Sequence, residues 1–212
     1  MRDYIIGTAK FFSILALAPI SVGFIDAWSP GLGLLLLLLG VPIAFAILVI
    51  GGILRTVTGV KLSRQTADVR TRVGLALIAP LGIVLTCLIS WPLLAAGNFT
   101  GNLSRLASNH RQYEVIIAKA RASRTSAWFA VDHGVTYSVD VGPPVRVAFN
   151  PAGMLDNWSG IIFDPTGDVM LADGFDPRTG KFRAPDGVTK LFDGDLVSCR
   201  HLWRDYYDCS FT

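Results

Sequence analysis

Acidic side chains are almost missing from the first 97 residues, which hold only Asp3, Asp26 and Asp68. Seven Lys or Arg residues give this part a net charge of +4, whereas residues 98–212 carry a net charge of −1. The excess of positive charge therefore belongs to one half of the chain. Because no basic stripe is interleaved with base-stacking aromatic residues, the sequence argues against nucleic acid as a partner.

Charge is also lacking from three long apolar runs. Residues 32–54 and 73–96 contain no ionisable side chain except Cys87, and residues 11–27 contain only Asp26, next to the interfacial position of Trp28. About 20 apolar residues in a helix cross a bilayer, so these runs predict three transmembrane helices. Proton and ion pathways usually need charged residues at the centre of a span. Their absence argues against a transporter, a pump or a channel.

The first two predicted spans are joined by the turn sequence Ser29-Pro30-Gly31, which predicts an antiparallel helical hairpin. Pro42 falls inside the second span and is expected to kink it. An alternative for residues 11–27 is the apolar core of a cleavable signal peptide ending near Ser21-Val22-Gly23. The apolar run continues past that site, which favours the span.

Residues 55–72 are predicted to form a compact basic loop between the second and third spans. Positively charged loops stay in the cytoplasm, so the N-terminus is expected inside the cell and residues 98–212 outside. The residue usage indicates a bacterial inner membrane and a periplasmic C-terminal domain. Besides setting topology, the loop is a candidate for binding anionic lipid heads or a cytoplasmic partner. Its basic residues are Arg55, Lys61, Arg64, Arg70 and Arg72.

An amphipathic helix is predicted to follow the membrane domain of residues 1–97. Gly97 and Gly101 form either a rigid corner or a hinge, and Asn102 or Ser104 is expected to cap the new helix. Residues spaced by three and four share one helical face, and His110 among them is expected to be a structural residue. This face consists of Leu103, Leu106, His110, Tyr113, Ile117 and Ala120.

After Ser126 the pattern alternates with period two, which predicts strands. Two segments, Asp164-Pro-Thr-Gly and Asp176-Pro-Arg-Thr-Gly, have the composition of β-turns. The fold class is therefore a membrane protein in which three transmembrane α-helices precede a small extracytoplasmic α+β domain, with one amphipathic helix on an antiparallel sheet. The predicted strands are residues 128–131, 136–141, 145–149, 160–164, 169–172, 197–203 and 206–211.

The last two predicted strands allow a sharper inference about Cys199 and Cys209. A three-residue loop, 203–205, lets the apolar residues of both strands share one face, whereas a two-residue loop places the cysteines on opposite faces. Directly opposite cysteines are close enough for a disulfide, and an extracytoplasmic compartment favours oxidation. The expected pairs are Cys199 with Cys209, Val197 with Phe211 and His201 with Tyr207.

Familiar metal motifs are missing. Cys199, His201 and Cys209, even with His133, lack the spacing of a zinc knuckle. The seven aspartates within residues 164–195 do not form a calcium loop ending in Glu, and most fit turn positions. No phosphate-binding glycine loop is present either. The sequence therefore points to no metal and no cofactor.

Catalytic motifs are missing as well. The nucleophile sequence Gly-x-Ser-x-Gly is not found, and a triad of His133 or His201 with Asp132 and a serine is an assembly that almost any chain permits. We therefore expect no enzymatic activity. A membrane-anchored hydrolase that uses one of these histidines is the weakest of three hypotheses.

The strongest hypothesis is a non-catalytic accessory or assembly subunit of a larger envelope complex, with other integral membrane proteins and the lipid bilayer as partners. The alternative is an extracytoplasmic module that senses or binds a protein or a small molecule, whose identity the sequence does not indicate. Such a module needs a concave patch of exposed aromatic side chains on its sheet. The candidates are Trp128, Trp158, Trp203, Tyr206 and Tyr207, with Phe129 beside them.

Overall fold

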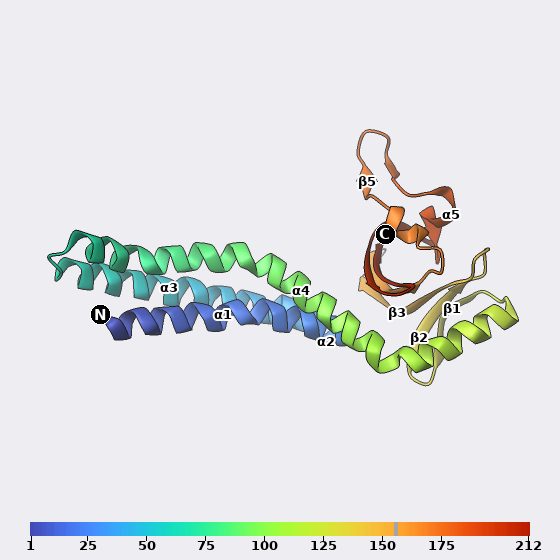
Figure 1. Ribbon diagram of the computed structural model, residues 1–212, viewed down its shortest axis with the longest axis horizontal. Helices are drawn as coiled ribbons and strands as arrows, with labels where there is room; N and C mark the ends of the chain where they lie inside the picture. Colours follow the sequence, from blue (N-terminus) through green and yellow to red (C-terminus); the bar gives the residue numbers. More distant parts are fainter. Residues whose placement is uncertain (155–156) are drawn as a thin grey trace. The chain divides into compact units, whose positions relative to one another are not determined.

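The computed structural model describes residues 1–154 and 157–212 and divides into two compact units. The first is helical and covers Met1–Gly101; the second covers Asn102–Thr212 and contains the sheet. Figure 1 shows both, coloured along the sequence. Each unit is described by itself.

The helical unit has three helices that are long and apolar enough to cross a membrane. The second of them runs from Pro30 to Arg64 with a π-helical turn inside it that ends two residues before Pro42. Proline has no N–H to donate and its ring crowds the preceding turn, which accounts for this widening. The elements are α1 (Arg2–Trp28), α2 (Pro30–Leu35), the π turn η1 (Leu36–Gly40), α3 (Val41–Arg64) and α4 (Val69–Ser123).

The helices extend beyond the predicted spans. The prediction that residues 55–72 form a loop is therefore wrong, because most of them are helical. Three of its five basic residues lie on α3, and the other two lie in the first turn of α4. Only residues 65–68 connect the helices, and Asp68 caps α4 by accepting a hydrogen bond from the Thr71 N–H at 2.8 Å. An exposed helix with Lys and Arg in its last turn is favourable because those charges oppose the helix dipole.

Helices α1 and α3 run antiparallel, as the turn at Ser29 requires. Phe12 packs with Leu48 and Ala79 in the buried cluster of this unit, and Tyr4, two turns earlier, donates to the Arg55 carbonyl at 2.9 Å. In these contacts the residue numbers on α3 rise as those on α1 fall. The N-terminus therefore lies at the same end as the α3–α4 turn (Figure 1).

Glycines bring α1 and α4 into close contact. A Cβ atom on Gly97 would overlap the carbonyl oxygen of Ile20, and one on Gly101 would lie 2.6 Å from the Ala27 Cβ. Small residues let helix backbones approach in a membrane, where packing rather than burial from water holds helices together. Both glycines lie inside α4, which continues to Ser123. The expected cap and new helix at Asn102 or Ser104 are therefore wrong.

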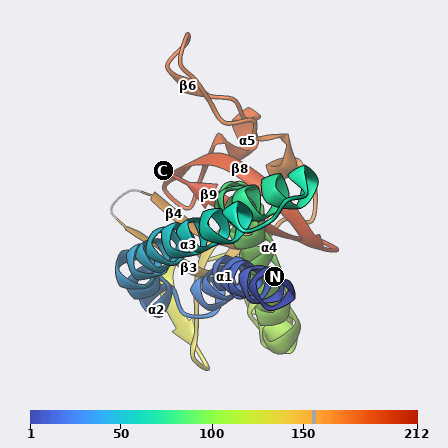
Figure 2. The ribbon, with the colours of Figure 1, turned by 90° about the vertical axis from the view of Figure 1, so that its left-hand side faces the viewer.

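The second unit contains a curled antiparallel sheet of seven strands in the order β1-β2-β3-β4-β9-β8-β7 (Figures 1 and 2). A separate two-stranded hairpin, β5–β6, projects from it. The strands are β1 (Ala127–Asp132), β2 (Val135–Asp140), β3 (Arg146–Met154), β4 (Asn157–Phe163), β5 (Phe175–Asp176), β6 (Lys181–Phe182), β7 (Lys190–Leu191), β8 (Gly194–Trp203) and β9 (Tyr206–Phe211).

One sheet face packs against the part of α4 that follows Gly101. Tyr113 stacks on Phe149 with ring centroids 4.0 Å apart, and its hydroxyl accepts a hydrogen bond from the Asn150 amide at 2.8 Å. Ile117 is also buried there. The predicted helix on an antiparallel sheet is thus present, and the aromatic pair contributes beyond its burial.

The other face is covered by the segment between β4 and β8, which includes the 3₁₀ helix η2 (Asp168–Leu171) and the short helix α5 (Asp186–Thr189). The predicted strand 169–172 is wrong, because the Asp164 carboxylate accepts the Val169 N–H at 3.1 Å and winds the chain after Gly167, whose φ is +76°. The core on this face contains Ala148, Ile162, Val169, Val188, Leu191, Phe192, Leu196, Tyr207, Cys209 and Phe211.

A buried ion pair closes this segment onto the sheet. Arg146 donates from Nε to Oδ1 of Asp164 at 2.9 Å, and both side chains are buried. Asp164 also accepts hydrogen bonds from Thr166. Burial acts to raise the pKa of Asp164, but these bonds and the Arg146 charge outweigh burial and hold the pKa below its usual value.

The β8–β9 hairpin has the predicted cysteine pairing but not the predicted loop. Trp203 pairs with Tyr206, so the loop has only two residues, and the extra residue Leu202 forms a bulge that restores the pairing of Cys199 with Cys209. A second bulge between Leu196 and Ser198 places Leu196, rather than Val197, opposite Phe211. Counting alternate residues along a strand no longer predicts which residues share a face once a bulge has shifted the later residues to the other face.

Candidate functional site

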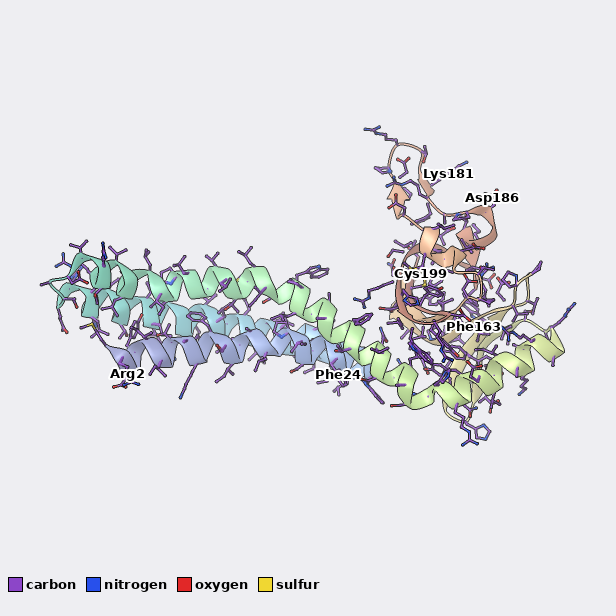
Figure 3. All side chains as sticks on the ribbon, in the orientation of Figure 1. Arg2, Phe24, Phe163, Lys181, Asp186 and Cys199 are labelled. Carbon is purple, nitrogen blue, oxygen red and sulfur yellow. A yellow bond between two sulfur atoms is a disulfide. The ribbon has the colours of Figure 1, made fainter. Side chains whose placement is uncertain are left out.

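The disulfide uses both cysteines of the possible zinc set. Cys199 and Cys209 are joined, with Cα atoms 4.1 Å apart (Figure 3 labels Cys199). His201 instead contacts the Arg204 carbonyl through Nε2 at 2.7 Å. In the described part of the chain, no group of three or more His, Cys, Asp or Glu side chains is placed to hold a metal ion.

The residues considered for a catalytic triad have other partners. His133 lies in the β1–β2 turn and contacts its neighbour Asp132, whose carboxylate also pairs with Lys119 at 3.6 Å. His201 lies on β8, at the opposite side of the strand order. The turn of His133 and the strand of His201 therefore lie near opposite edges of the sheet, and the structure does not bring the two histidines together.

Two of the five candidate aromatic residues are buried and form part of the core. Tyr206 lies against Tyr113 and Phe163, and its hydroxyl donates to Glu114 at 2.7 Å. Tyr207 belongs to the core on the other face. Burial, followed by the bond and charge of Glu114, raises the pKa of Tyr206 above its ordinary value. Neither tyrosine is available as a contact surface.

Two of the tryptophans are partly covered. Trp158 stacks on Phe211 with ring centroids 4.0 Å apart, nearly parallel. Trp203 is 39% exposed, with its edge-to-face contact to His110 at 5.1 Å between centroids and the Arg204 guanidinium 4.3 Å from its ring. The Trp158 ring mainly supports local packing, whereas the Trp203 ring stays exposed beside His110, which also contacts Tyr206.

Three of the exposed apolar residues of the sheet unit lie close together in sequence on β1. Trp128, Phe129 and Val131 are 51%, 49% and 68% exposed, and the Trp128 and Phe129 rings meet edge to face at 4.9 Å between centroids. These three residues are called the β1 surface below. Apolar side chains standing together on a strand at the edge of a sheet commonly mark an interaction site.

A bulge gives the β1 surface its shape. Trp128 and Phe129 fit between the Ala127–Val139 and Ala130–Tyr137 pairs, where β2 has only Ser138. Phe129 has φ of +48°, and its N–H donates to the Ser138 hydroxyl at 3.1 Å. A bulky residue in this region costs on the order of 1–3 kcal/mol. The chain holds both rings outward at the expense of local strain.

The outer edge of β1 presents free backbone groups to a partner strand. The two-residue turn His133-Gly134 has positive φ at both positions, so the flanking pair Asp132 and Val135 exchange hydrogen bonds. Alternate residues then direct N–H and C=O away from β2, and Val131 is one of them. The most exposed apolar side chain of the edge therefore sits where a further strand would pair.

The opposite edge of the sheet is shorter and more covered. Its terminal strand β7 has two residues, and beside it the Gly174 N–H donates to the Val197 carbonyl of β8 at 2.9 Å. An isolated bridge also joins Asp173 to Ser198. Strand β1, with six residues, is thus the longer open edge of this sheet.

The basic residues form the second feature that sequence reasoning selected. Arg55, Lys61 and Arg64 lie along the last three turns of α3, and Arg70 and Arg72 lie at the start of α4. Arg72 donates to the Thr66 carbonyl at 3.0 Å through Nη2, which closes the short turn. Helical extension therefore stacks these charges along an axis instead of gathering them in a loop.

No protein-family model, no curated protein and no solved structure matches this chain.

Proposed function

We propose that this protein is a membrane-anchored accessory subunit that binds another protein of an envelope membrane complex through the edge of its sheet. The β1 surface supports the proposal: Trp128, Phe129 and Val131 stand exposed on an edge strand whose outer backbone groups are directed away from the sheet. Proteins usually protect such edges with charges or cover them. Here apolar rings occupy the position instead.

The mode of binding that fits this edge is addition of a strand. An extended segment of the partner adds backbone hydrogen bonds to β1, and its alternate side chains pack against the exposed rings. Trp is also the residue type most often responsible for binding energy at interfaces. Pairing would cover the apolar residues and the free backbone groups in one step.

The helices supply the anchor in this proposal. The positive-inside rule places the basic end in the cytoplasm and the sheet outside, in a bacterial inner membrane. No ionisable side chain other than Cys87 occurs in residues 73–96, so this span needs neighbours only for packing. The protein would then hold its partner at the membrane without carrying out a reaction.

Site-specific cross-linking in native membranes tests the proposal. A photoreactive amino acid at Val131 is expected to give one discrete adduct with a membrane protein, whereas the same group at Lys181 on the β5–β6 hairpin gives none. The Trp128→Ser variant should reduce co-purification of that same protein by about tenfold, a change of about 1.4 kcal/mol.

A Lys181→Ser variant is the matched control, because Lys181 is exposed and belongs to the projecting hairpin. Purification of the protein alone, with no adduct from Val131, would contradict the proposal and favour a ligand-binding module. Equal loss of the partner in both serine variants would place the contact elsewhere.

A further inference from the structure

All seven Lys and Arg residues of the helical unit lie toward one end of it. The antiparallel course of α1 and α3 produces this arrangement, since the Thr66 hydroxyl contacts the Met1 sulfur at 3.9 Å and Arg2 lies at the same end as the α3–α4 turn (Figure 3). At the other end of α1 lie Asp26 and Trp28. The seven are Arg2, Lys10, Arg55, Lys61, Arg64, Arg70 and Arg72.

These charges occupy two levels along the helix axis. Arg55 lies beside Phe11, so Lys10 and Arg55 mark the inner level, next to the apolar spans. Arg2 and Arg64 mark the outer level. Eight or nine residues separate the levels on each helix, which at 1.5 Å per residue is about 12–14 Å. In a bilayer that covers the apolar spans, the inner level would border the hydrocarbon and the outer level would stand in water.

Arg55 is the decisive residue of the inner level. Its guanidinium lies over the Phe11 ring, 4.0 Å from the centroid, and its Nε is buried without a hydrogen-bond partner among the described residues. No ion pair in the described part of the chain involves any of the seven basic residues. An external anion would stabilise a partly covered guanidinium that has no counter-charge, through charge-assisted hydrogen bonds.

The acidic residues of this unit do not supply that anion. Asp68 is occupied with Thr71 at the start of α4, and Asp26 lies at the opposite end. Asp3 lies one turn from the N-terminus, toward the outer level. The positive-inside rule explains why this end is basic, but it does not explain a guanidinium held against a ring at the edge of the apolar region.

We propose that this end of the helical unit binds the phosphate groups of anionic phospholipids, with Arg55 and Lys10 at the phosphate level. A guanidinium offers a planar fork of donors that fits phosphate oxygens, and the ring beneath it holds the fork in place. The outer charges, on Lys61, Arg64, Arg70 and Arg72, then add attraction to the negative surface of the leaflet.

Native mass spectrometry of the purified full chain tests this proposal, with phosphatidylglycerol or phosphatidylcholine added in detergent. The protein is expected to retain phosphatidylglycerol about tenfold more strongly. Arg55→Gln should lower that preference about fivefold, and Arg55→Lys should give an intermediate value because the charge remains while the fork is lost. Melting temperatures of both variants show that they are folded.

The matched control is the double variant Arg178→Gln with Lys181→Gln on the β5–β6 hairpin, which removes two exposed charges from the other unit. This variant should keep the wild-type preference. Equal retention of both lipids, or an equal loss in the control, would overturn the proposal. So would displacement of the bound lipid by millimolar inorganic phosphate, since the site would then take a small anion and not a lipid head.

Discussion

Arg146 and Asp164, joined at 2.9 Å from Nε to Oδ1, form a buried ion pair that fastens the segment after β4 to β3. Asp164→Asn should lower the free energy of unfolding by about 3 kcal/mol, because it removes the buried partner of Arg146 and leaves only the half-exposed Asp168 carboxylate, 3.4 Å from Nη2. Chemical denaturation of the purified protein in detergent measures this. The double change Arg146→Met with Asp164→Leu should recover part of the loss, whereas an equal loss would contradict the ion-pair explanation.

The same pair predicts the acid sensitivity of the sheet unit. The pKa of Asp164 is lower in the folded protein than in the unfolded chain, so its contribution is fully present above the unfolded value of about 3.9 and is lost as the pH falls toward the folded value. Melting curves between pH 7 and pH 3 should show a fall that is smaller in Asp164→Asn. Parallel curves for the two proteins would refute this.

The hydroxyl of Tyr206 predicts the behaviour in alkali. Its pKa is raised in the folded protein, so the stabilising contribution is present below the unfolded value of about 10 and is lost as the pH rises above it. Tyr206→Phe removes the hydrogen bond to Glu114 and should cost about 1 kcal/mol at pH 7. The melting temperature of Tyr206→Phe should also fall less steeply above pH 10 than that of the wild type. If both proteins show the same fall, other groups cause it.

The disulfide should stabilise the sheet unit by restricting the unfolded chain. Its cysteines are 10 positions apart, and closing so short a loop is worth about 2–3 kcal/mol. The double variant Cys199→Ser with Cys209→Ser should show this loss, and a reducing agent should lower the melting temperature of the wild type but not that of the double variant. Cys87→Ser, which removes the remaining cysteine, is the control and should respond to reduction as the wild type does.

Close packing at Gly97 should make the helical unit sensitive to a single methyl group. Gly97→Ala places a Cβ against the Ile20 carbonyl and should lower the melting temperature in detergent. Gly74→Ala, on the same helix but with no other side chain or helix within 4 Å of the added Cβ, should keep or slightly raise it because alanine favours helix by up to about 1 kcal/mol. Equal changes in melting temperature for the two variants would show that the packing of α1 against α4 does not depend on the close approach at Gly97.

Sequence reasoning recovered features that depend on pattern alone. Three charge-poor runs predict three long helices, and alternation predicts most strands. The pairing of Cys199 with Cys209 was also predicted, although through the wrong loop. The bulge at Leu202 could not be foreseen because bulges depend on tertiary packing and leave no regular signal in the sequence.

Features that depend on tertiary partners were missed. Nothing near Arg146 in the sequence marks it as the partner of Asp164, eighteen positions later, and burial of Tyr206 and Tyr207 removed two candidates that look equally suited to a surface. The Gly97-x₃-Gly101 spacing was available, and it should have favoured helix packing over a corner. Trp128 and Phe129 remained exposed, as the site hypothesis required.

The position of β9 determines when this domain can become complete. Of the strands of this sheet it is synthesised after all the others, yet it lies between β4 and β8. Until it arrives, β4 has an unpaired edge, and transient edges of this kind promote aggregation. Thr212 continues the pairing with two backbone hydrogen bonds to Asp195. A ribosome or translocation channel that still holds residues 206–212 therefore also postpones closure of the sheet.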